Sequence, residues 1–355
     1  MVSPHDRIPW WAWVIPALGL GLVFVGLPAL SLFGALMAAI LIVAVFASVL
    51  HAEVVAARLG EPYGTLVLAV AVTVIETGLI ISLMRDGTQP ELARDAVFAT
   101  LMIALNGIMG AALVLGGAKH VFQSFGARGA TAFLTVVIAI ATLTLVLPNY
   151  TVTTPGPVFS ARQLVFVAVL SLALYMVFLF VMTVRHKGDF LHGHGIEPGE
   201  APPGVGRALA GFGLLVLSLT VVVLLAKKLA PALEVGVAWL GAPASLSGVV
   251  VAALVLLPEG VSALKAAARN DLQMAMNLTL GSVLACIGLT IPAVAGYALW
   301  TGVPLQLGLA PSGMVLLMLT FLVSILTLTS GRTTLLQGAV HLMIFGVFLL
   351  LSFVP

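Results

Sequence analysis

The sequence predicts an all-α polytopic membrane protein of about 11 transmembrane helices, with one extra N-terminal helix and two inverted five-helix repeats. Three observations predict this fold class: scarce charge, a series of long apolar runs and an internal repeat. The 355 residues include 15 Lys+Arg and 13 Asp+Glu, while 61% are hydrophobic. Soluble domains carry roughly a quarter charged residues. The composition therefore excludes a soluble enzyme, a disordered chain and a nucleic-acid-binding protein.

The apolar runs give the predicted spans, because a helix needs about 20 apolar residues to cross the hydrocarbon core. Trp10, Trp11 and Trp13 at the start of the first span are typical of an interfacial aromatic belt. This span continues directly into the second, so a cleaved signal peptide is not expected. The predicted spans are residues 10–28, 31–50, 64–84, 97–117, 130–147, 163–184, 206–226, 246–264, 275–296, 312–330 and 333–353.

The distribution of Lys and Arg predicts the orientation. With the N-terminus inside, ten of these residues fall in cytoplasmic segments. Five fall outside: Arg85, Arg94, Arg162, Lys227 and Lys228. Positive residues favour the cytoplasmic side. We therefore expect a bacterial-type inner (plasma) membrane protein with a cytoplasmic N-terminus and, after eleven spans, an external C-terminus. Residues 185–205 form the cytoplasmic linker, which is either flexible or a metal-sensing loop through His186, His192 and His194.

The internal repeat is clearest in two short stretches. Residues 53–62 and 234–243 both fit the pattern E-V-x-x-A-x-L-G-x-P, and each precedes an apolar helix with one internal glutamate. Because each repeat holds five spans, the second must enter the membrane from the opposite side. Inverted repeats are common in secondary transporters. The expected organisation is an N-terminal helix (1–30), a first repeat (31–184), the linker (185–205) and a second repeat (206–355).

Two carboxylates lie deep within apolar spans. Glu76 follows Pro62 by 14 residues, and Glu259 follows Pro243 by 16. A charge at mid-bilayer costs roughly 2.5–3.5 kcal/mol on insertion scales. Symmetric positions for two such groups favour a shared cation and proton site near the midplane. The alternative is a pair of protonated glutamic acids that hold helices together.

Polar groups beside the glutamates could supply further oxygen ligands. Pro258 cannot donate a helix hydrogen bond, so it releases the carbonyl of Leu254 next to Glu259. Hard cations such as Ca²⁺ and Na⁺ prefer oxygen ligands of this kind. Thr73 could coordinate a cation near Glu76 or bond its own helix.

Three further polar residues have two possible roles each. Asn106 and Ser282 either support the site or form hydrogen bonds between helices. His341 is interpreted as a hydrogen-bonded packing residue, with a proton relay as the alternative. The single Cys excludes a cysteine-rich metal site. No resident cofactor and no enzymatic activity are expected, because no recognised nucleophile, phosphate or metal motif is present.

At these residues the chain resembles the calcium/proton exchanger branch of the calcium:cation antiporter superfamily, and most closely the bacterial calcium (sodium or potassium)/proton antiporters. The first resembling region runs from Gly60 to Ile81 around Glu76. The second runs from Leu257 to Pro292 and includes Leu-Pro-Glu259-Gly. Both are similar to the family's α-repeats, and the resemblance extends over nearly the whole chain.

The resemblance implies that Glu76 and Glu259 bind the cation and the protons, with Asn106 and Ser282 at family positions. Many family members carry Gly-Asn three residues before each glutamate, where this chain has Val72-Thr73 and Leu256. Fewer amide ligands leave room for Na⁺ or K⁺. The expected function is secondary exchange of cytoplasmic Ca²⁺, Na⁺ or K⁺ for protons by alternating access. The alternatives are a sodium/potassium:proton antiporter without calcium selectivity and a cation channel. The expected partners are inorganic cations, protons and the lipid bilayer.

Overall fold

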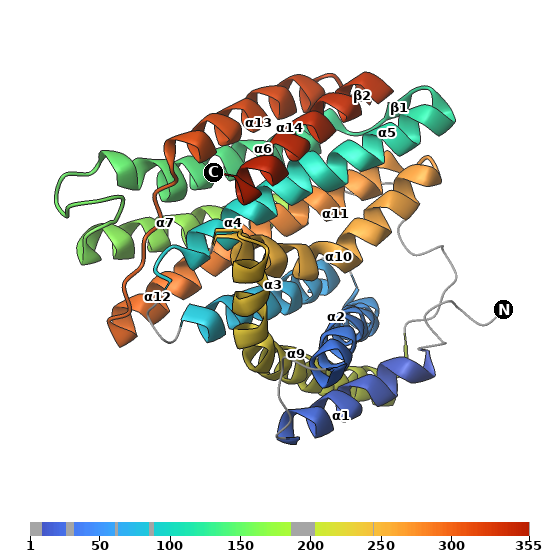
Figure 1. The fold of residues 1–355 in the computed structure, drawn as a ribbon. Coiled ribbons are helices and arrows are strands. Elements are labelled where there is room, and N and C mark those ends of the chain that lie inside the picture. Colours follow the sequence, from blue (N-terminus) through green and yellow to red (C-terminus); the bar gives the residue numbers. More distant parts are fainter. Residues whose placement is uncertain are drawn as a thin grey trace. The chain divides into compact units, whose positions relative to one another are not determined.

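The computed structural model describes residues 9–25, 32–60, 63–84, 89–185, 203–243 and 245–354 (Figure 1). Within these ranges the chain is helical apart from connecting segments and two strands of two residues each. The chain forms two compact units, and each unit takes helices from both halves of the sequence.

The first unit contains α1 (Trp10–Phe24), α2 (Leu32–Leu59), α3 (Tyr63–Met84, through Leu83) and α9 (Val205–Trp239). Helices α2 and α9 pack along each other in opposite directions. A methyl group placed on Gly211, near the start of α9, would lie 3.3 Å from Val54 near the end of α2. Gly78 of α3 packs against Val223, which lies further along α9. A methyl group on Gly78 would lie 2.8 Å from the Val223 side chain. The helices of this unit therefore depend on small residues for close contact.

The second unit contains all the remaining described elements. In several of its spans a π-helical or 3₁₀ segment (η) interrupts or ends the α-helix. The elements are α4 (Leu92–Met102), η2 (Ile103–Ile108), α5 (Met109–His120), β1 (Gln123–Ser124), α6 (Ala127–Ala141), η3 (Thr142–Val146), η4 (Leu147–Tyr150), α7 (Ala161–Phe180), η5 (Val181–Arg185), α10 (Leu246–Ala268), α11 (Leu272–Ala285), η6 (Cys286–Thr290), α12 (Ile291–Thr301), α13 (Pro311–Thr329), β2 (Arg332–Thr333) and α14 (Leu335–Phe353).

Contacts between connecting segments define the two ends of the second unit. At one end, which we call the basic end, β1 pairs antiparallel with β2, and Lys119 donates to the Ala268 carbonyl. At the other end Gln306 donates to the Pro90 carbonyl, and Gly308 donates to the Pro157 carbonyl. Figure 1 shows β1 and β2 together at one end of α5, α6, α13 and α14.

These two ends establish that the repeat is inverted. Helix α4 begins at the end of the unit that contains Pro90. Its repeat partner α11 begins at the opposite, basic end, close to Ala268. Helices α6 and α13, and likewise α7 and α14, also begin at opposite ends. The prediction of two inverted five-helix repeats is confirmed.

Local structure repeats along with the topology. Gly60 and Gly241, from the two matching ten-residue stretches, follow the ends of α2 and α9 with φ of +68° and +66°. Glycine adopts this left-handed conformation without steric cost, which makes it the usual residue after a helix end. Both α7 and α14 begin with a capping box, Ser160 with Gln163 and Thr334 with Gln337. The repeated sequence therefore specifies the same helix boundaries in both halves.

The predicted spans correspond to the observed helices. Within the described ranges, nine helices or continuous helical stretches are long and apolar enough to cross a membrane, and Trp10–Phe24 and Val70–Met84 are shorter apolar helices. One difference concerns Lys227 and Lys228, which were expected in an external loop but lie inside α9. A helix can continue beyond its apolar stretch because lysine is a good helix former and its charge can reach the interface. Most of the predicted linker, including its three histidines, lies outside the described residues.

Candidate functional site

Glu76 lies on the buried face of α3, with 2% of its surface exposed. Thr73, one helical turn earlier, is also buried, and Ile75, Leu79 and Ile80 are almost fully enclosed. A buried charge in apolar surroundings is costly unless it is paired or bound. This part of the first unit therefore holds a carboxyl group in low-dielectric surroundings.

Glu259 lies on α10, between two residues that alter the helix. Pro258 lies inside the helix, and Gly260 follows the glutamate; all three are buried. A methyl group on Gly260 would lie 3.2 Å from the Ile108 side chain, so glycine lets α10 approach η2 closely. Pro258 has no N–H and cannot donate a helix hydrogen bond to the Leu254 carbonyl.

Asn106 lies fully buried in the π-helical segment η2. Its side-chain nitrogen donates to the Thr320 hydroxyl at 2.9 Å, and its oxygen lies 3.0 Å from Nδ1 of His341. The other ring nitrogen of His341 lies 3.2 Å from the Thr327 hydroxyl. The amide oxygen accepts from Nδ1–H, which leaves Nε2 to accept from Thr327. Asn106 therefore links the span formed by α4, η2 and α5 to α13 and α14.

These contacts bear on the roles considered for the polar residues. Asn106 and His341 both form hydrogen bonds between helices, and a ligand role for Asn106 stays a prediction. Ser282 is half-buried on α11, four residues before the first residue of the π-helical segment η6. Glu76 and Thr73 belong to the first unit, whereas Glu259, Pro258, Asn106 and Ser282 belong to the second. The convergence of the two glutamates on one site stays a prediction.

Sequence reasoning missed the π-helical segments of the central spans. The segment η2 interrupts the span Leu92–His120, and η6 interrupts its repeat partner Leu272–Thr301. Segments of this kind are frequent at functional sites. Apolar periodicity does not reveal them, although Asn106-Gly107 and Gly288 lie within them. Thr320 and Thr327 were also missed, since threonine within an apolar helix usually bonds its own backbone.

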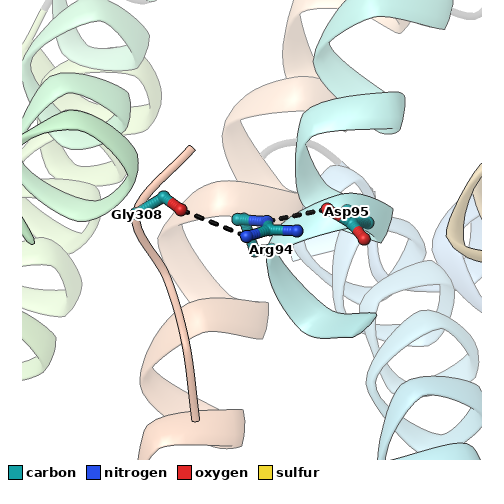
Figure 2. Close-up of polar contacts among 3 residues, drawn as sticks. All are labelled: Arg94, Asp95 and Gly308. Carbon is teal, nitrogen blue, oxygen red and sulfur yellow. Dashed lines mark hydrogen bonds and ion pairs between the residues drawn. The ribbon is translucent and has the colours of Figure 1, made fainter. Parts of the chain in front are cut away.

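A second polar cluster lies in the first turn of α4. Arg94 lies between Asp95 and the 302–310 segment: its Nε is 2.7 Å from Asp95 Oδ1, and its Nη1 donates to the Gly308 carbonyl at 3.2 Å (Figure 2). Both side chains are largely buried beside a pocket of about 140 Å³. From the sequence, Arg94 was expected among the external Lys and Arg residues. Its burial could not be predicted, because it depends on the packing of the distant 302–310 segment.

Within the part of the chain that the structure describes, no group of three or more His, Cys, Asp or Glu side chains is placed to hold a metal ion. The single Cys286 is a buried thiol.

Comparison with known proteins identifies the family. The sequence model of the family described as "Sodium/calcium exchanger protein" matches residues 29–184 and 210–354. The chain is 48% identical to y4hA of Sinorhizobium fredii (strain NBRC 101917 / NGR234), which is named as an ionic transporter; the match covers 98% of this chain and 97% of the relative. It is 37% identical to ChaA of Escherichia coli (strain K12), the sodium-potassium/proton antiporter, over 93% of this chain and 90% of the relative.

Solved structures agree on the fold. The Ca²⁺/H⁺ antiporter protein YfkE superimposes with a TM-score of 0.72 at 16% identity, covering 97% of this chain and 99% of that one. The H⁺/Ca²⁺ exchanger CAX superimposes with a TM-score of 0.72 at 15% identity, covering 99% of this chain and 89% of that one. The chain thus belongs to the sodium/calcium exchanger protein family, and it is an integral membrane cation antiporter and not an enzyme.

Proposed function

We propose that this chain exchanges a cytoplasmic cation, Ca²⁺ with Na⁺ or K⁺ also accepted, for protons at a site formed by Glu76 and Glu259. The observation that carries the proposal is the burial of both carboxyl groups in equivalent apolar helices of an inverted repeat, with 2% and 9% of their surfaces exposed. Proton exchange is further supported by the relative ChaA, named a sodium-potassium/proton antiporter.

Two carboxylates can couple the two fluxes by charge alone. Together they neutralise one Ca²⁺, or each accepts one proton, and in both cases the site is nearly uncharged. The unoccupied dianion is costly in low-dielectric surroundings. It would therefore cross between the two access states more slowly than either occupied form. The inward proton gradient would then drive the cation out of the cell without ATP.

The backbone around Glu259 would help to hold the cation. The Leu254 carbonyl, to which Pro258 cannot donate, would supply a neutral oxygen beside the carboxylate, and hard cations favour such mixed oxygen sets. Thr73 and Ser282 would add hydroxyl oxygens. Asn106 would act through its hydrogen bonds to His341 and Thr320. Its contribution would be to fix η2, which packs against α10, to α13 and α14.

A second candidate is sodium or potassium/proton exchange without calcium transport. The relative ChaA, named a sodium-potassium/proton antiporter, favours it. Exchange of monovalent ions would need only one of the two carboxylates to be neutralised per cation. The cation selectivity then depends on how many neutral oxygens complete the site.

The charges at the two ends of the second unit support a cytoplasmic location for its basic end. The described segments there, 119–128, 265–271 and 330–334, hold five Lys or Arg residues and one acidic residue, Asp271. The opposite segments, 89–95, 147–162 and 302–310, hold two of each sign. Positive residues favour the cytoplasmic side. With eleven spans, we infer a cytoplasmic N-terminus and an external C-terminus.

The test is transport by the purified full chain in proteoliposomes with an imposed pH gradient and a panel of Ca²⁺, Na⁺ and K⁺. Wild type should move protons against the added cation. Glu76→Gln and Glu259→Gln should each abolish exchange, whereas Glu91→Gln, at the half-buried N-cap of α4, should retain it. Robust exchange in either of the first two variants would refute the two-carboxylate site. Cation current without proton counterflow would indicate a channel.

A further inference from the structure

An apolar groove lies on the second unit between α6 and α13. It encloses about 290 Å³ and opens at the surface. Its wall is mostly aliphatic and is formed by Thr131, Leu134, Thr135, Ile138, Ile325 and Thr329.

The threonine hydroxyls of the groove donate their hydrogen bonds within their own helices and need no hydrogen-bond acceptor on an occupant. Thr131 and Thr135 donate to carbonyls of α6 one turn earlier, and Thr329 donates to Ile325, each at 2.7 Å. Because these hydroxyls are bonded within their own helices, the groove offers aliphatic surface. An occupant that matches it should be a flexible hydrocarbon chain.

Two exposed arginines lie at one end of this groove. Arg128 is one turn before Thr131 on α6, and Arg332 is three residues after Thr329. The two segments meet, because a methyl group on Gly331 would lie 3.5 Å from the Ala127 side chain. Among the described residues neither guanidinium forms an ion pair. The acidic residue of this end, Asp271, accepts a hydrogen bond from the Met274 backbone as the N-cap of α11.

We propose that this corner binds an anionic glycerophospholipid, with an acyl chain in the groove and the phosphate between Arg128 and Arg332. A guanidinium binds phosphate oxygens in a planar two-bond geometry. Basic residues next to transmembrane helices attract anionic lipid headgroups by the same electrostatics. The site provides an apolar surface for the acyl chain and two positive charges for the headgroup. The two parts follow one another along the helices, as the chain and the headgroup of a lipid do in a bilayer. It does not depend on the proposed ion site, since it uses none of that site's residues.

The proposal is tested by measuring lipid binding to the full chain in detergent, by native mass spectrometry and thermal unfolding. The probes are phosphatidylglycerol, phosphatidylcholine with the same acyl chains, and glycerol phosphate. Phosphatidylglycerol should bind and raise the unfolding temperature more than the other two. The double variant Arg128→Gln/Arg332→Gln should weaken its binding roughly 30-fold, since each arginine contributes on the order of fivefold near an anionic surface.

Two further variants separate the parts of the site. Ile138→Trp, at a half-buried position of the groove wall, fills the groove and should also weaken phosphatidylglycerol binding. Arg162→Gln, exposed at the start of α7, should not weaken it. Equal binding of both lipids, or undiminished binding to the double variant, would overturn the proposal. A change in oligomeric mass with Ile138→Trp while lipid binding persists would assign the groove to a second copy of the chain and also overturn it. Binding of glycerol phosphate as tight as that of the lipid would exclude a role for the groove.

Discussion

Asn106 illustrates how one amide can be satisfied inside an apolar helix bundle. Its oxygen and its nitrogen both have partners on other helices, His341 and Thr320, and none of these side chains is exposed. These two hydrogen bonds hold η2 to α13 and α14, so Asn106 orders the helices that it joins.

The contribution of this network can be measured by removing its partners. Thr320→Val should cost about 0.6 kcal/mol of stability, the average for hydrogen bonds between transmembrane helices. His341→Leu should cost more, about 1–3 kcal/mol, because it leaves the buried Asn106 oxygen and the Thr327 hydroxyl without this partner. Unfolding of the detergent-solubilised protein, followed by circular dichroism, measures both. Thr220→Val is the control, since that exposed threonine bonds only its own helix. An unchanged unfolding midpoint for His341→Leu would contradict this view of the network.

At the scale of the helices, the sequence predicted which helices form, their order and their directions. These features follow from the length of the apolar runs and from the repeated E-V-x-x-A-x-L-G-x-P pattern, both of which depend on local sequence. The left-handed glycines Gly60 and Gly241 confirm that the two stretches have the same structural role. The π segments and the burial of Asp95 were not predictable in this way. Each depends on how distant helices pack, and apolar periodicity carries no information about such contacts.

The same limit applies to the candidate site. The sequence identified Glu76 and Glu259 because a carboxylate in an apolar span is conspicuous. It could not identify Thr320 or Thr327, which become important only when α13 and α14 bring them to Asn106 and His341. The glutamates can be recognised in the sequence because they are charged. The threonines that bond Asn106 and His341 can be recognised only in the folded structure.

The close approach of α5 and α14 yields a prediction at the element scale. A methyl group on Gly338 would lie 2.6 Å from the Val114 nitrogen, which does not belong to a flexible side chain and cannot move aside. Gly338→Ala should therefore destabilise the second unit by about 1–3 kcal/mol, as overpacking does. Gly346→Ala on the same helix meets nothing within 4 Å and should be neutral or slightly stabilising, because alanine favours helix. Thermal unfolding of both variants compares them; equal midpoints would show that the helices can separate without loss.

At the scale of the whole molecule, the unequal charge of the two ends leads to a labelling experiment. In a Cys286→Ser background, cysteines are placed at Val152 and at Phe122, exposed residues at opposite ends of the second unit. An impermeant maleimide added to intact cells should label Val152→Cys. Phe122→Cys should react after the cells are opened, because the basic end is expected in the cytoplasm. The reverse pattern would invert the orientation inferred above.

The π segment η2 gives its span one residue more than a regular α-helix would hold. A π turn accommodates this residue within a single wider turn, so the helix on either side keeps nearly the bearing of a regular helix. Gly110 and Gly117, after the wide turn, therefore still face α14. Deleting one residue from Ile103–Ile108 would narrow the turn around Asn106 but leave these two glycines against α14. The wide turn thus confines a change of local geometry to the surroundings of one polar side chain and leaves the packing of the rest of the span unaltered.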